Sequence, residues 1–99
     1  MRLTDEQMEA IRQSARQIGG ELARVRVFGS RLDDSARGGD LDLMLELPES
    51  VDNPALMAAQ LAARASHVLH GRKVDVLISA PNLMRLPIHG IAFQEGRLL

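Results

Sequence analysis

The chain has 99 residues, enough for one small domain with a single hydrophobic core. Hydrophobic residues make up 45% and charged residues 25%, which excludes disordered and fibrous proteins. There is no cysteine, so a disulfide scaffold, a thiolate zinc site and a catalytic thiol are excluded as well. The formal net charge is −1 and tyrosine and tryptophan are absent, which argues against a dedicated nucleic-acid-binding protein.

The composition also predicts the compartment. Residues 1–10 are polar and acidic, which is untypical of a signal peptide. No apolar run approaches the roughly 20 residues of a membrane-spanning helix. Because a cysteine-free chain suits a reducing environment, we expect a cytoplasmic protein without membrane contact.

The first expected elements are a helix and a strand. Thr4 and Gln7 have the spacing of a helix-capping box. Apolar residues then recur at helical intervals as far as Leu22, with a glycine pair at 19–20 that ends or weakens the helix. Residues 25–28 form a short β-prone run, and residues 30–39 are polar and glycine-rich, as in a loop.

Residues 40–47 alternate between two faces, which predicts a strand. One face carries Asp40, Asp42, Met44 and Glu46, and the other carries four leucines.

The second half of the chain predicts a crossover unit. A helix is expected over residues 55–69, a strand over 73–78 and a short last helix over 88–95. A strand, a helix and another strand in this order pair the two strands in parallel. The expected fold is therefore α/β (α+β): one domain over residues 1–99, a small mixed β-sheet with helices packed on it.

The candidate chemistry lies in carboxylates. Asp40 and Asp42 share one strand face, where they repel each other unless a cation lies between them. Such hard oxygen ligands suit Mg²⁺ together with substrate phosphates. Asp75 interrupts a second apolar strand, where an acid is costly without a partner. If the two strands are neighbours, the three acids converge.

A phosphate-binding turn is the second candidate feature. Gly29-Ser30 follows the first strand and offers backbone N–H groups and a hydroxyl. With the acids, this describes a two-metal site for phosphoryl chemistry. Taken singly, each part has a plainer explanation. Gly29-Ser30 can be an ordinary turn, Asp40 and Asp42 can lie on a solvated strand face, and Asp75 can be an exposed residue at a strand edge. A degenerate site on a preserved scaffold is the alternative for the whole set.

The combined pattern resembles the minimal nucleotidyltransferases of the polymerase-beta-like superfamily. Their signature is a hydrophobic residue, Gly-Ser, nine residues, Asp-hydrophobic-Asp-hydrophobic, and a third Asp in a later strand. Here it reads Phe28-Gly29-Ser30, nine residues, Asp40-Leu41-Asp42-Leu43 and Val74-Asp75-Val76. Residues 90–99 are also similar to the family's closing helix and Glu-Gly turn, so the resemblance spans residues 24–99.

The resemblance implies a role for each matching position. Gly29 and Ser30 would hold the triphosphate of ATP, and Asp40 and Asp42 would bind two Mg²⁺ ions. Asp75 would complete one metal site and help to deprotonate the incoming hydroxyl. Members of this length are commonly antitoxins encoded beside a HEPN-family ribonuclease toxin, and transfer AMP from ATP onto a tyrosine of that toxin.

Other polar residues have weaker cases. Arg31 either neutralises a phosphate or is a solvated loop residue, and Arg37 and Lys73 are weaker candidates for the same role. His67 and His70 stand three apart on the expected helix, but no third nitrogen or sulfur ligand accompanies them. His89 is expected on a helix surface. The methionines Met8, Met44, Met57 and Met84 are expected as core filler or contact surface.

Three functions compete. The first is a Mg²⁺-dependent protein adenylyltransferase. The second is an antitoxin with vestigial chemistry that neutralises its toxin by binding alone, for which three clustered acids have no use. The third, a transferase acting on small molecules, is disfavoured because 99 residues leave no second domain to hold the substrate. Homo- and hetero-oligomers both remain open.

Overall fold

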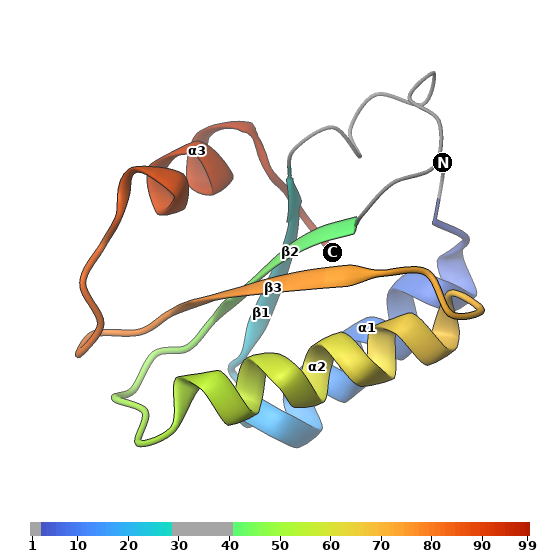
Figure 1. The fold of residues 1–99 in the computed structure, drawn as a ribbon, viewed down its shortest axis with the longest axis horizontal. Coiled ribbons are helices and arrows are strands. Elements are labelled where there is room, and N and C mark those ends of the chain that lie inside the picture. Colours follow the sequence, from blue (N-terminus) through green and yellow to red (C-terminus); the bar gives the residue numbers. More distant parts are fainter. Residues whose placement is uncertain (1–2, 29–40) are drawn as a thin grey trace.

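Among the described residues, four strands form one mixed sheet at the centre of the protein (Figure 1). The computed structural model describes residues 3–28 and 41–99. The strand order is β3-β2-β1-β4, with β2 parallel to β3 and antiparallel to β1, and β1 antiparallel to β4. The strands are β1 (Arg24–Phe28), β2 (Leu41–Glu46), β3 (Val74–Ser79) and β4 (Arg97–Leu98). The expected small mixed sheet and its parallel crossover are confirmed, and β4 is an addition.

In the described part of the chain, three helices pack on this sheet: α1 (Asp5–Gly19), α2 (Pro54–Val68) and α3 (Pro87–Glu95). The expected capping box begins α1, because the Thr4 hydroxyl accepts from the backbone N–H of Gln7 at 3.0 Å and the Gln7 side chain accepts from that of Thr4 at 2.9 Å. The side chain of Asn53 caps α2 in a similar way. The three helices therefore begin within a few residues of where the sequence predicts.

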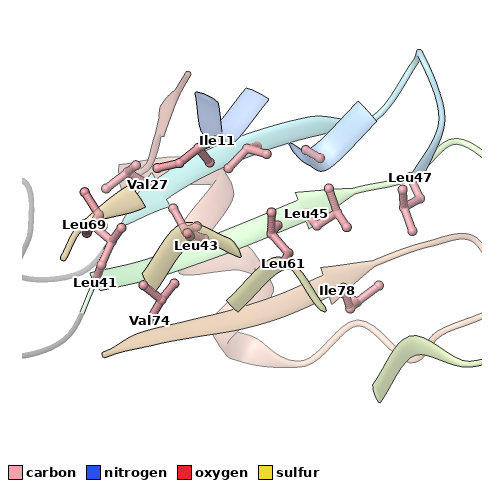
Figure 2. Close-up of a cluster of buried hydrophobic side chains, with 13 residues drawn as sticks. Ile11, Val27, Leu41, Leu43, Leu45, Leu47, Leu61, Leu69, Val74 and Ile78 are labelled. Atoms are coloured by element: carbon pink, nitrogen blue, oxygen red, sulfur yellow. The ribbon is translucent and has the colours of Figure 1, made fainter. Parts of the chain in front are cut away.

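The main core lies between the sheet and the pair α1 and α2, which lie side by side on one face (Figure 1). Figure 2 shows the leucines of β2 pointing into this layer, as the alternation at 40–47 predicts. Ile11 of α1 and Leu61 of α2 meet them there and are fully buried. Burial of these branched side chains is the main force that holds the two helices to the sheet.

The opposite face of the sheet is covered in part by α3. Met44 is completely buried on that face, where it packs with Phe28 of β1 and Ala92 of α3. Met44 thus fills a second, smaller core, in agreement with its interpretation as core filler. Because Asp42 and Glu46 alternate with Met44 along β2, they lie on this same face of the sheet.

Three sequence-based expectations about single residues are wrong. Leu22 lies beyond the end of α1, since Gly20 breaks the helix with φ +98°, and its side chain is 74% exposed. His70 follows α2 with φ +61° and is not on the helix. His89 is not a surface residue: only 4% of it is exposed.

His89 is buried because its ring connects two backbone groups. Its Nδ1 accepts from the backbone N–H of Leu86 at 2.9 Å, which leaves Nε2 to donate to the carbonyl oxygen of Ile78 at 2.8 Å. The side chain therefore fixes the start of α3 to the end of β3.

Candidate functional site

Asp42 and Asp75 lie opposite each other on two neighbouring parallel strands. They are Cα partners in the register of β2 and β3, so both side chains project from the same face of the sheet. Neighbouring strands are about 4.8 Å apart, which places the two carboxylates within reach of one ion. Phe28, the last residue of β1, is in turn the Cα partner of Asp42. The two strands are thus neighbours, as the expected convergence of the three acids requires, and Asp40 lies outside the described residues.

Backbone pairing and burial fix this register. Leu41 and Val74, each one residue before an acid, are partners whose side chains are buried in the main core. The backbone N–H of Leu41 also donates to the carbonyl oxygen of Lys73 at 3.0 Å. A slip by one residue would turn the apolar side chains outward, so the hydrophobic pattern holds the acids in place.

The two acids differ in their exposure to water. Asp42 is half-buried on a central strand, whereas Asp75 is exposed. This differs from the expected acid in a core strand, because β3 is the edge of the sheet and has β2 alone as a neighbour among the described strands. Asp75 therefore does not carry the desolvation cost that the sequence suggests.

Several predicted site residues lie outside the described residues. These are Gly29, Ser30, Arg31, Arg37 and Asp40. Their proposed roles in phosphate and metal binding stay predictions. Sequence alone places position 29 directly after Phe28 and position 40 directly before Leu41.

The side chains of the described pair are ligands of the type that a divalent metal binds. Mg²⁺ binds proteins through one or two carboxylates and completes its shell with water and phosphate oxygens. Asp42 and Asp75 supply two carboxylates on one face. Within residues 3–28 and 41–99, no three His, Cys, Asp or Glu side chains gather as a metal site, and this includes His67 and His70.

A second polar cluster lies on the same face and was not predicted. Arg26 donates through Nε to Glu46 at 2.7 Å in a largely buried ion pair, and its guanidinium lies 5.3 Å from the centre of the Phe93 ring. Arg85 lies 4.7 Å from the same ring. The alternation in β1 and β2 could have placed Arg26 and Glu46 on one face, but no local pattern predicts that α3 brings Phe93 over them.

Comparison with known proteins does not identify the chain. No protein-family model matches it, and no curated protein is similar to it. A bilayer span would need a longer and more apolar helix than any in the described residues.

Proposed function

We propose that the chain is a Mg²⁺-dependent nucleotidyltransferase that transfers AMP from ATP to a hydroxyl of a partner protein. The partner we propose is a HEPN-type ribonuclease toxin, modified on tyrosine and thereby silenced, so that this chain acts as its antitoxin. The observation that supports the proposal is the in-register pair Asp42 and Asp75 on one face of the sheet. The motif around Gly29, Ser30 and Asp40 adds the sequence support.

The chemistry gives the three acids two tasks, which are metal binding and proton transfer. In the transfer, the acceptor oxygen forms a bond to the α-phosphorus of ATP, and the bond from that phosphorus to the pyrophosphate oxygen breaks. Bound Mg²⁺ would neutralise charge on the phosphates. Asp40 and Asp42 would hold it, and Asp75 would complete one metal site. Asp75 would accept the proton of the acceptor hydroxyl and release it to water, a task for which its exposed position is suitable.

Transfer of label tests this proposal. The chain is incubated with Mg²⁺, the HEPN-type protein encoded beside it, and ATP labelled either at the α- or at the γ-phosphate. Label from the α-position alone on the partner indicates transfer of AMP. We expect Asp75→Asn to slow single-turnover transfer by roughly 10²–10⁴-fold. Asp5→Asn, which changes an exposed acid at the start of α1, is the matched control and should transfer normally. Transfer by Asp75→Asn at the unmodified rate would refute its role.

A binding antitoxin without chemistry is the second candidate. The observation in its favour is a run of exposed apolar side chains at Met84, Leu86, Ile88 and Ile91, on and before α3. Inhibition of the ribonuclease by equimolar chain without ATP, unchanged by Asp42→Asn, would support this candidate. Inhibition that requires ATP and is lost with Asp42→Asn would support the enzyme.

A further inference from the structure

A groove lies at the end of the sheet away from Asp42. Its walls are the end of α1, the segment between β2 and α2, and the first turn of α2, and its volume is about 590 Å³. Leu47, the residue after β2, lines it. Leu47 is five positions after Asp42, which is about 17 Å along an extended chain. The groove is therefore distinct from the candidate nucleotide site.

Large apolar side chains line this groove and are open to water. Leu22 is 74% exposed and Leu56 is 52% exposed, and both belong to its lining together with Val51 and Met57. Such exposure is costly in water, and contiguous exposed apolar surface is typical of a contact site. The volume is within the range of pockets that hold a few side chains or a small ligand.

The charges of the groove have one sign. Glu21, Glu49 and Asp52 are part of its lining, and no lysine, arginine or histidine is among the described residues that line it. Arg24 does not line the groove but lies in an adjoining hollow, which shares Leu22, Leu47 and Pro48 with it and also contains Glu46. An occupant with positive charge is therefore favoured by charge complementarity.

The walls of the groove are held in shape before any partner binds. The side chain of Asn82 makes two hydrogen bonds to Val51: its Oδ1 accepts from the backbone N–H at 3.0 Å, and its Nδ2 donates to the carbonyl oxygen at 2.8 Å. Asn53 accepts from the backbone N–H of Leu56 at 3.1 Å and so orders the first turn of α2. A preformed site loses less conformational entropy on binding.

We propose that this groove binds a segment of a partner protein in which a large apolar side chain is flanked by lysine or arginine. The apolar side chain would lie between Leu22 and Leu56, and the basic groups would lie against Glu49 and Asp52. This inference uses no residue of the candidate nucleotide site and does not rest on the proposed function.

Designed peptides test the chemistry of the occupant. The probe is a fluorescein-labelled ten-residue peptide of alternating leucine and arginine, and its binding to the full chain is followed by anisotropy. In the matched peptides, glutamate replaces arginine or serine replaces leucine. We expect both replacements to weaken binding at least tenfold. Binding of the leucine–arginine peptide should weaken with salt, as for exposed charges. Failure of this peptide to bind would overturn the proposal.

Variants of the chain locate the peptide. Glu49→Lys with Asp52→Lys, and separately Leu22→Ser with Leu56→Ser, should each weaken binding at least tenfold. These side chains line the open groove, so the variants should fold. The control Glu6→Lys with Glu95→Lys makes the same change in net charge elsewhere and should bind normally. Equal loss in the control and in the groove variants would show attraction to net charge alone and refute the groove.

Two further measurements separate the remaining explanations. If sedimentation shows that the unmodified chain is a dimer and that the groove variants are monomers, the groove is covered by a second copy and the proposal is overturned. Asp42→Asn should bind the peptide like the unmodified chain, whether or not it transfers AMP. Loss of peptide binding in Asp42→Asn would refute the separation of the two sites.

Discussion

Replacement of His89 by alanine should destabilise the fold more than any other histidine substitution. The ring is buried and hydrogen-bonds two backbone groups, the N–H of Leu86 and the carbonyl oxygen of Ile78. A buried backbone group that loses its partner costs about 1–3 kcal/mol. Two such groups give a loss of about 2–6 kcal/mol, a large fraction of the roughly 5–15 kcal/mol that a domain of this size has in total.

The assay is urea and thermal unfolding followed by circular dichroism, since the chain has no tryptophan or tyrosine for fluorescence. In a domain of about 100 residues, the expected loss corresponds to a fall in Tm of about 10 °C or more. His67→Ala is the matched control, because His67 is exposed on α2 and its replacement should change stability by less than about 0.5 kcal/mol.

A conservative variant tests the geometry. His89 is the third residue of α3, the position from which glutamine in a capping box accepts from the backbone N–H before the helix. His89→Gln can therefore keep the bond to Leu86 but not the bond to Ile78 at the same time, and should recover about half of the loss. If His89→Ala is no less stable than His67→Ala, the two hydrogen bonds do not hold α3 to the sheet.

Three other substitutions have an expected direction of change in the stability of the fold. Gly90→Ala should stabilise the protein by about 0.5–1 kcal/mol in thermal unfolding, because glycine is unfavourable within a helix and an added Cβ has no atom within 4 Å. A lower Tm would contradict this. Gly96→Ala should destabilise it by about 1–3 kcal/mol, because the Cβ would collide with the backbone carbonyl of Ala92; an unchanged urea midpoint would be the wrong result. In the absence of metal and at low salt, Asp75→Asn should raise the free energy of unfolding by about 0.2–1 kcal/mol, because it removes the negative charge that lies in register with Asp42. A marked fall in Tm would show instead that Asp75 is structural.

Periodicity predicts most of the fold. The alternation at 40–47 and the helical intervals at 55–69 follow from which side of an element faces the core, and each gives its element within a few residues. The two-residue strand β4 has no pattern of its own to detect. Leu22 has the right spacing for the apolar stripe of α1, but the chain leaves the helix at Gly20 before reaching it.

The burial of His89 and the exposure of Asp75 could not be predicted because both depend on tertiary position. His89 is next to apolar residues on a short helix, and nothing local indicates that the end of β3 lies against it. Asp75 is on a strand as apolar as β2, and only the strand order shows that β3 is an edge. Local sequence predicts whether a segment is a helix or a strand better than it predicts which other elements lie beside it.

The pairing of Asp42 with Asp75 could be predicted, because a crossover of this kind makes β2 and β3 parallel and the buried leucines fix their register. Asp75 is exposed at the edge of the sheet, where packing does not require an acid. An uncharged polar side chain at position 75 would be equally exposed to water and would not repel the carboxylate of Asp42. Two like charges in register weaken a sheet slightly, whereas a cation between them reverses the sign of that interaction. A bound cation would turn the repulsion between the two carboxylates into attraction to the cation, which is the physical reason for placing the metal of the proposed transferase at this pair.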